Sequence, residues 1–247
     1  MLITRSESSA LGSCLGPFIK RLEKNREKSG SRIVLALDSV GGKERYSFED
    51  AARLISEVSP WICSVKLGLP AYFSLGRDVS KLTSVFEGIP FLADFKTADI
   101  PHTNQLILGY LFGELGFGGA IVHAFIGPTA LSSAREVAEL HGAEVLSLVG
   151  MSHLGADLLN SNMDNMIKLS AGAGISSLVV PSTLPEMISR ARRSAPSSQI
   201  FSPGVGVQGG SPRTTLDAGA DYLIVGRSIT GSDHPATSAM EMCRQCN

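Results

Sequence analysis

The stretch IPFLADFK, residues 89–96, is a short apolar run that ends in an aspartate and a lysine. Its hydrophobic residues follow one another almost without interruption, whereas a strand with one face in water would alternate apolar and polar residues. The run therefore predicts a strand buried on both faces, as in a parallel sheet covered by helices. The two charges at its end need a separate explanation, because a charge that leaves water costs several kcal/mol unless it is paired.

Seven further runs of this kind start about 22 to 33 residues apart, the room that a strand, a helix and two loops require. They are RIVLALD from residue 32, WICSVKLG from 61, GGAIVHAF from 118, AEVLSLVG from 143, ISSLVVPS from 175, QIFSPGVG from 199 and DYLIVGRS from 221. Helical periodicity predicts helices over residues 47–58, 104–116, 130–140, 163–172 and 184–194, the first with a capping box of Ser47 and Asp50. Eight strands alternating with helices in about 250 residues predict an α/β fold, a single closed (β/α)8 TIM barrel.

The first 30 residues precede the first predicted strand, and we expect residues 1–30 to form a helical extension that packs on the barrel. Within them, LGPFIKRLEKNREKSG, residues 15–30, has the pattern of an amphipathic helix that could close the bottom of the barrel. Residues 31–247 are expected to form the barrel as one catalytic domain, since no linker marks the start of another.

Composition narrows the classes of partner. The 247 residues carry a net charge of −1 and no block of like charge, so we expect neither nucleic acid nor a membrane surface as a partner. No apolar stretch reaches the roughly 18 residues of a membrane span. The chain has only four cysteines and no signal sequence, which predicts a cytoplasmic protein. Cys243 and Cys246 form a CxxC motif, but a zinc site needs two more ligands at matching spacing, and we expect no metal.

Polar residues stand at the ends of the predicted strands, where (β/α)8 barrels carry their reactive groups. They are Asp38, Lys66, Asp94, Lys96, His123, Ser152, Pro181, Ser182, Gly226 and Arg227. In an extended strand Asp94 and Lys96 point to the same side, about 7 Å apart along the chain. Asp99 lies beyond the strand, where the Ile100–Pro101 bond disfavours helix, so its side chain could face a neighbouring subunit. This cluster predicts a catalytic centre; a structural ion-pair network at the barrel rim is the alternative.

A glycine-rich segment, SPGVGVQGG, follows the start of the seventh predicted strand, and Gly226 with Arg227 ends the eighth. Many barrels bind phosphate with the loops after strands seven and eight. Glycines let backbone N–H groups approach an anion, and an arginine offers a fixed fork of donors. The pair of features favours a phosphate site over a mobile turn.

With these residues in place, the chain resembles the orotidine 5′-monophosphate decarboxylase family in its compact archaeal and bacterial-like form. DFKTADIPHT, residues 94–103, matches the family motif D-x-K-x-x-D-I-x-x-T at every defined position. Further segments resemble the other family signatures in the same order, namely LALD with Asp38, VKLG with Lys66, MSHLGA with Ser152, PGVGVQGG with Gln208 and VGRSI with Arg227. One departure is Leu154, which stands where relatives often have proline.

The resemblance implies a carboxy-lyase that converts orotidine 5′-monophosphate to UMP in pyrimidine biosynthesis, without a cofactor and as a homodimer. It implies catalytic roles for Lys96, as the acid that protonates the ring carbanion, and for Asp94, Asp99 and Lys66. It implies substrate binding by Asp38, Lys66, Ile100, Thr103, Ser152, Pro203, Gln208, Gly226 and Arg227. Asp99, Ile100 and Thr103 would act in trans, from the second subunit.

The sequence leaves two other hypotheses about the function open. Sugar-phosphate decarboxylases and aldolases of the same superfamily share D-x-K-x-x-D and the phosphate site, but they use magnesium and lack the Ile-x-x-Thr continuation that Ile100 and Thr103 provide here. A second possibility is a non-catalytic protein that binds UMP-like ligands without turnover. The intact charged residues Asp94, Lys96 and Asp99 argue against that reading.

Overall fold

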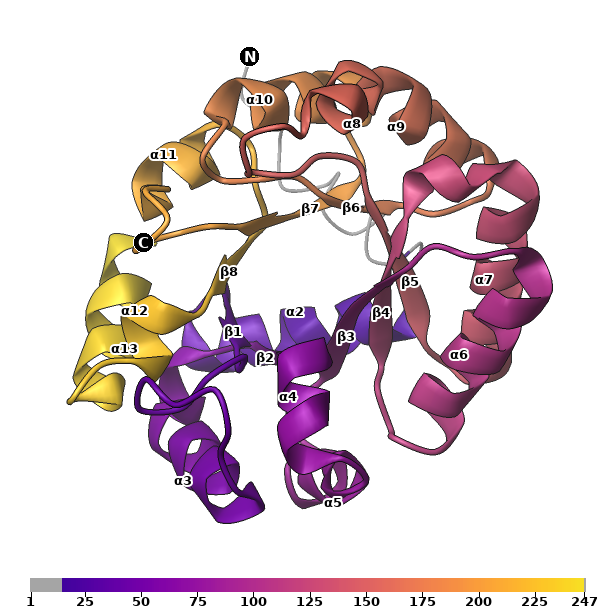
Figure 1. The fold of residues 1–247 in the computed structure, drawn as a ribbon. Coiled ribbons are helices and arrows are strands. Elements are labelled where there is room, and N and C mark those ends of the chain that lie inside the picture. Colours follow the sequence, from indigo (N-terminus) through magenta and orange to yellow (C-terminus); the bar gives the residue numbers. More distant parts are fainter. Residues whose placement is uncertain (1–14, 247) are drawn as a thin grey trace.

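Eight parallel strands close into a barrel in the order β1 to β8, with β8 pairing back to β1 (Figure 1). This computed structural model describes residues 15–246. The strands are β1 (Ile33–Ala36), β2 (Ser64–Gly68), β3 (Phe91–Thr97), β4 (Gly119–His123), β5 (Glu144–Leu148), β6 (Ser177–Val179), β7 (Gln199–Pro203) and β8 (Tyr222–Val225). Each lies within one of the eight apolar runs, except that β3 extends one residue beyond its run, to Thr97, so the predicted (β/α)8 barrel is confirmed.

Helices surround the barrel, as expected from the segments between the runs (Figure 1). They are α3 (Phe48–Val58), α4 (Leu69–Leu75), α5 (Asp78–Val85), α6 (Pro101–Gly113), α7 (Gly127–Leu140), α8 (Asp157–Ser161), α9 (Met163–Gly172), α10 (Pro185–Ser194), α11 (Pro212–Asp217), α12 (Arg227–Thr230) and α13 (Pro235–Gln245), with the 3₁₀ turns η1 (Ser59–Trp61) and η2 (Ala124–Ile126). The predicted starts of α6 and α7 were wrong by three residues. Both helices carry a proline in their first turn, where its fixed φ suits a helix and its missing N–H costs nothing.

The helix expected in residues 15–30 is α2 (Pro17–Ser29), which packs beneath the barrel. Its residues Phe18, Ile19 and Leu22 are buried against side chains that point into the barrel from the strands. A Cβ at Gly119 would lie 3.2 Å from the Phe18 ring, so the helix sits directly on β4. Residues 1–14 of the predicted extension lie outside the described residues, and the division into an extension and a barrel domain stays a prediction.

The predicted capping box starts α3. The Asp50 N–H donates to Ser47 Oγ at 3.1 Å, and the Ser47 N–H donates to Asp50 Oδ2 at 3.2 Å. Both donors would otherwise lack a partner in the first turn of the helix. Within residues 15–246, no helix is both long and apolar enough to cross a membrane.

Candidate functional site

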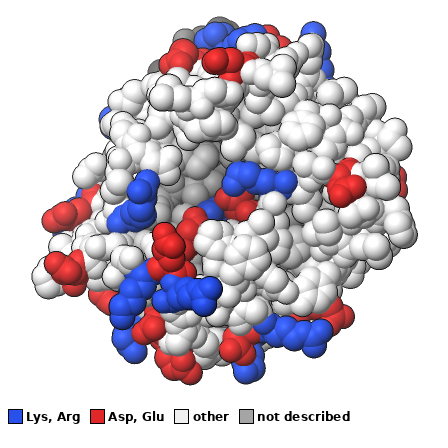
Figure 2. All heavy atoms as spheres, in the orientation of Figure 1, with Lys and Arg blue, Asp and Glu red and all other residues white. Residues whose placement is uncertain are grey.

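A cavity of about 840 Å³ opens at the carboxyl ends of the strands, within the size range of small-molecule sites. Figure 2 shows the hollow with acidic and basic side chains gathered around it. Among the residues that line it are Asp38, Lys66, Asp94, Lys96, Ser152, Pro203, Gln208, Gly226 and Arg227. The fold thus brings together residues that the sequence separates by up to 189 positions, because every strand delivers its end to the same rim.

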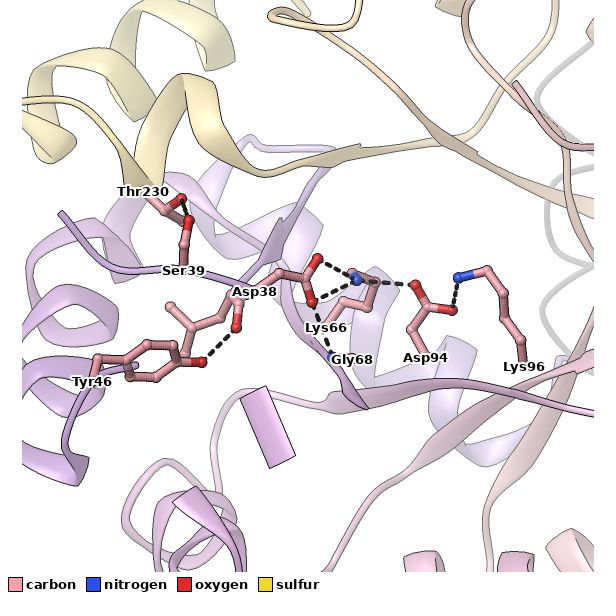
Figure 3. Close-up of polar contacts among 9 residues, drawn as sticks. Asp38, Ser39, Tyr46, Lys66, Gly68, Asp94, Lys96 and Thr230 are labelled. Carbon is pink, nitrogen blue, oxygen red and sulfur yellow. Dashed lines mark hydrogen bonds and ion pairs between the residues drawn. The ribbon is translucent and has the colours of Figure 1, made fainter. Parts of the chain in front are cut away.

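Four charged side chains form a continuous line across this cavity (Figure 3). Lys66 Nζ lies 2.9 Å from Asp38 Oδ2 and also 2.9 Å from Asp94 Oδ2. Lys96 Nζ lies 2.6 Å from Asp94 Oδ1. Asp38 follows β1, Lys66 belongs to β2, and the other two belong to β3, so neighbouring strands supply alternating charges. Each charge is compensated by the next, as burial requires.

The surroundings of Lys66 and Asp94 favour their charged forms. Burial alone would lower the pKa of Lys66, but the charges of Asp94 and Asp38 outweigh it, so the pKa is raised above its usual value. Burial alone would raise the pKa of Asp94, but Lys66 and then Lys96 lower it below the usual range. Lys66 is 5% exposed and Asp94 12%, whereas the Lys96 side chain is 37% exposed. Lys96 is therefore the ammonium group of this line that is open to the cavity.

The backbone of Lys96 has φ +48°, in the left-handed region, which is uncommon for residues other than glycine. The pairing of β3 with β4 also shifts register between Ala93 and Thr97. Our expectation of a regular extended strand through Lys96 was therefore wrong, although its side chain does meet Asp94. Such a conformation costs on the order of 1–3 kcal/mol and persists only where its surroundings impose it.

Asp99, Ile100 and Thr103 are not among the residues that line the cavity. The Asp99 side chain is exposed, and its Oδ1 accepts the Ile100 N–H at 2.7 Å. Sequence reasoning missed Asn104, which is fully buried and bonds to both backbone groups of Asp99, donating to its carbonyl at 2.7 Å and accepting its N–H at 3.2 Å. A polar side chain at a buried helix position was the available signal. These bonds hold the segment outward at the rim.

The glycine-rich segment after β7 forms an ordered turn. Val205 pairs with Gly210, and Ser182 donates from its hydroxyl to the Pro203 carbonyl at 2.9 Å. A Cβ at Gly210 would lie 2.2 Å from Ser182 Oγ, so this contact requires glycine. Gly226 and Arg227, at the start of α12, line the same cavity. Backbone amides and a guanidinium at one rim are groups that can bind an anion.

His123, one of the polar residues at the ends of the predicted strands, does not line the cavity. Its ring lies 4.7 Å from that of Phe125, and its Nδ1 is buried without a hydrogen-bond partner. Burial, and then the charge of Lys96, lower its pKa, which favours the neutral ring. Across residues 15–246, no group of three or more histidine, cysteine, aspartate or glutamate side chains is arranged to hold a metal ion.

Sequence comparison shows which known proteins this chain is similar to. Residues 31–242 match the family described as "Orotidine 5'-phosphate decarboxylase / HUMPS family". The orotidine 5′-phosphate decarboxylase of Methanococcoides burtonii is 38% identical over 219 residues, which cover 88% of this chain and 98% of that protein. The enzyme of the same name from Thermoplasma volcanium is 39% identical over 204 residues, covering 83% and 88%.

Solved structures show the same likeness. Orotidine 5′-monophosphate decarboxylase from Methanocaldococcus jannaschii, complexed with the inhibitor BMP, matches with a TM-score of 0.79 and 29% identity, covering 88% of this chain and 99% of that one. The enzyme from Pyrococcus horikoshii matches with a TM-score of 0.75 and 32% identity, covering 87% and 98%. The family match spans most of the chain, and this protein belongs to the orotidine 5′-phosphate decarboxylase / HUMPS family.

Proposed function

We propose that this protein is a carboxy-lyase that decarboxylates orotidine 5′-monophosphate to UMP in pyrimidine synthesis, without a cofactor. The line of charges from Asp38 to Lys96 is the observation that carries the proposal, because it holds one ammonium group open to a cavity that Gln208 and Arg227 also line. The names of the relatives, and the inhibitor complex of one of them, support the same substrate. The small number of cysteines supports our expectation of a cytoplasmic enzyme.

Lys96 would be the acid of the reaction. When the bond from the pyrimidine ring to the carboxylate breaks, its electron pair stays on the ring carbon and carbon dioxide leaves. The developing negative charge is stabilised by the Lys96 ammonium, which then gives a proton to that carbon and regains one from solvent. The 37% exposure of the Lys96 side chain suits this role, since the group must reach both substrate and water.

Asp94 and Lys66 would keep this acid in place and charged. Asp94 Oδ1 holds Lys96 Nζ at 2.6 Å, and the lowered pKa of Asp94 keeps its carboxylate ionised at neutral pH. A carboxylate here would also lie close to the leaving carboxylate of the substrate and repel it, a ground-state effect whose share in catalysis is contested.

The rest of the substrate would be held by the remaining cavity residues. Asp38 and Lys66 would bind ribose hydroxyls, Ser152 the pyrimidine, and Pro203, Gln208, Gly226 and Arg227 the phosphate. A positioned acid contributes only about 10²–10⁴-fold, whereas enzymes reach about 10⁶–10¹⁷-fold. Binding energy from the phosphate and ribose must therefore help to order the reacting carbon against Lys96.

We also propose that a second copy of this chain completes the site with Asp99, Ile100 and Thr103. These residues stand at the rim outside the cavity of their own chain. Apolar side chains are exposed on neighbouring α4 and α6, with Phe73 at 79% and Leu106 at 62%, and Ile100 is 64% exposed. The hydroxyls of Tyr72 and Tyr110, 3.4 Å apart, join the two helices into one face. An apolar face beside an outward-held carboxylate fits a symmetric partner.

Ultraviolet absorbance of orotidine 5′-monophosphate incubated with the protein in EDTA tests the reaction. We expect the orotate chromophore to be converted to uracil, with Lys96→Ala losing at least about 10²-fold in kcat. Lys81→Ala, which removes an exposed lysine paired with Asp78 on α5, is the matched control and should retain activity. Near wild-type kcat in Lys96→Ala would exclude this lysine as the acid. Activity on another sugar phosphate that EDTA abolishes would favour the magnesium-dependent relatives, and tight UMP binding without turnover would favour a silent binding protein.

Mixing two inactive variants tests the contribution in trans. In a dimer of one Lys96→Ala chain and one Asp99→Ala chain, one site would combine the intact Lys96 of one subunit with the intact Asp99 of the other. Random pairing should then restore about one quarter of wild-type activity. No recovery after exchange of subunits, or a fully active monomer in sedimentation, would contradict the proposal.

A further inference from the structure

Ser228 lies next to Arg227 in α12, and its hydroxyl contacts the phosphate loop, which we define as residues 203–210. The Val207 N–H donates to Ser228 Oγ at 3.1 Å. We propose that Ser228 is a positioning residue that holds the phosphate loop against α12, so that Gln208 and Arg227 are placed to grip one phosphate together. This inference rests on the proposed function and adds a residue to it.

The loop is folded so that this contact falls at its tip. Within the loop, the Gly206 N–H donates to the Gly210 carbonyl at 2.8 Å, and the Gly209 N–H donates to the Gly206 carbonyl at 2.7 Å. Val207 and Gln208 stand exposed at the turn between these bonds. The Val207 N–H points away from the loop and donates to Ser228. Gln208 is the next residue, so this bond limits the positions that the Gln208 backbone can adopt.

Gly206 gives a second, independent sign of close approach. Its φ is +86°, and a Cβ built on it would lie 2.0 Å from Ser228 Oγ. The backbone therefore passes directly over the serine, at a distance that only glycine permits. The contact therefore belongs to the close packing of the loop against Ser228 of α12.

On its other side, α12 is attached to the start of the barrel. The Gly41 N–H donates to the Thr230 carbonyl at 2.8 Å, and the Ser39 and Thr230 hydroxyls lie 3.4 Å apart (Figure 3). Thr230 is buried, and Ser39 adjoins Asp38 of the charged line. Ser228 thus belongs to a helix that is itself bonded to the segment after β1, which makes it a fixed support for the glycine-rich loop.

By restricting the loop before the ligand binds, Ser228 lowers the entropic cost of ordering the loop around a phosphate. Ser228 would not touch the substrate itself. Its removal should therefore weaken binding of ligands that carry the phosphate and leave nucleosides unaffected. Because the loop would hold the phosphate equally in the substrate complex and in the transition state, this loss of binding is uniform and should appear as a higher KM with kcat unchanged.

The experiment compares Ser228→Ala with the wild type in binding of UMP and uridine by calorimetry, and in kcat and KM for orotidine 5′-monophosphate. Loss of one hydrogen bond should raise the Kd for UMP and the KM about three- to tenfold. Uridine binding and kcat should change by less than about twofold. Ser228→Thr keeps the hydroxyl and should bind UMP like the wild type. Ser232→Ala is the control, since this serine bonds the His234 N–H and the Ser238 hydroxyl instead of the loop.

Equal UMP affinity in Ser228→Ala and wild type would overturn the inference, as would an equal loss of UMP and uridine binding, which would mean general damage to the site. Tighter UMP binding in the variant would also overturn it, because the bond would then hold the loop away from the ligand. Failure of the wild type to convert orotidine 5′-monophosphate would contradict the proposed function, a separate result from any difference between the two proteins in binding UMP.

Discussion

Lys66→Met is the substitution that most directly tests whether the line of charges is a buried network. Methionine has a similar length and fills the same space, but it removes the ammonium group that joins Asp38 to Asp94. Lys66 is 5% exposed, so water cannot replace the lost contacts well. The variant leaves Asp94 with Lys96 alone, and Asp38 with the Gly68 N–H, which it accepts at 3.2 Å.

Breaking a buried ion pair by removing one partner costs about 3–5 kcal/mol. We expect the lower end, about 3 kcal/mol, because Asp38 is 43% exposed and can be hydrated, and Asp94 keeps one cation. For a domain of this size, each kcal/mol shifts Tm by about 2–4 °C. The variant should therefore unfold about 6–12 °C below the wild type at neutral pH.

The pH dependence follows from the directions of the two pKa shifts. The folded-state pKa of Asp94 is lowered, so its contribution is present above its unfolded pKa and is lost as pH falls through the folded value. The folded-state pKa of Lys66 is raised, so its contribution is present below its unfolded pKa and is lost as pH rises through the folded value. The difference in stability between the two proteins should be largest from about pH 5 to pH 9. It should narrow in stronger acid.

Thermal unfolding followed by circular dichroism at several pH values gives the measurement. Lys81→Met, which breaks an exposed ion pair with Asp78, is the matched control and should leave Tm unchanged. A Lys66→Met protein as stable as this control, or a difference that does not narrow in acid, would show that the charges do not support one another as we argue.

Three further changes test other parts of the molecule. Leu22→Ala should cost about 2–5 kcal/mol, because Leu22 is fully buried beneath the barrel, and chemical denaturation with the 84%-exposed Leu140→Ala as control would measure it. Ser47→Ala removes the cap of α3 and should lower the free energy of unfolding by about 1 kcal/mol in the same assay; an unchanged value would mean that the cap is redundant. Gly206→Ala should raise the KM for orotidine 5′-monophosphate more than Gly209→Ala, because both have positive φ but only the first Cβ meets Ser228 Oγ. Equal effects would point to backbone strain alone.

The architecture could be predicted from the sequence because it depends on local patterns of apolar residues. Buried parallel strands need near-continuous apolar runs, and eight such runs at regular spacing leave few folds other than a closed barrel. The capping box at Ser47 was readable for the same reason, since its two partners are three residues apart. Because (β/α)8 barrels carry their reactive groups at the carboxyl ends of the strands, the sequence also placed Asp38, Lys66, Asp94 and Lys96 at the same end of the barrel.

Only the tertiary structure decided how these groups meet. The sequence did not reveal that Lys66 bridges two carboxylates, since that depends on the register between β1, β2 and β3. It did not reveal the left-handed backbone of Lys96, which accompanies a register shift against β4. The contact of Val207 with Ser228 also arises only when β7 and β8 lie side by side. Periodicity is a local property that the chain carries in its order of residues, whereas a hydrogen bond between distant residues depends on how the closed barrel sets their positions.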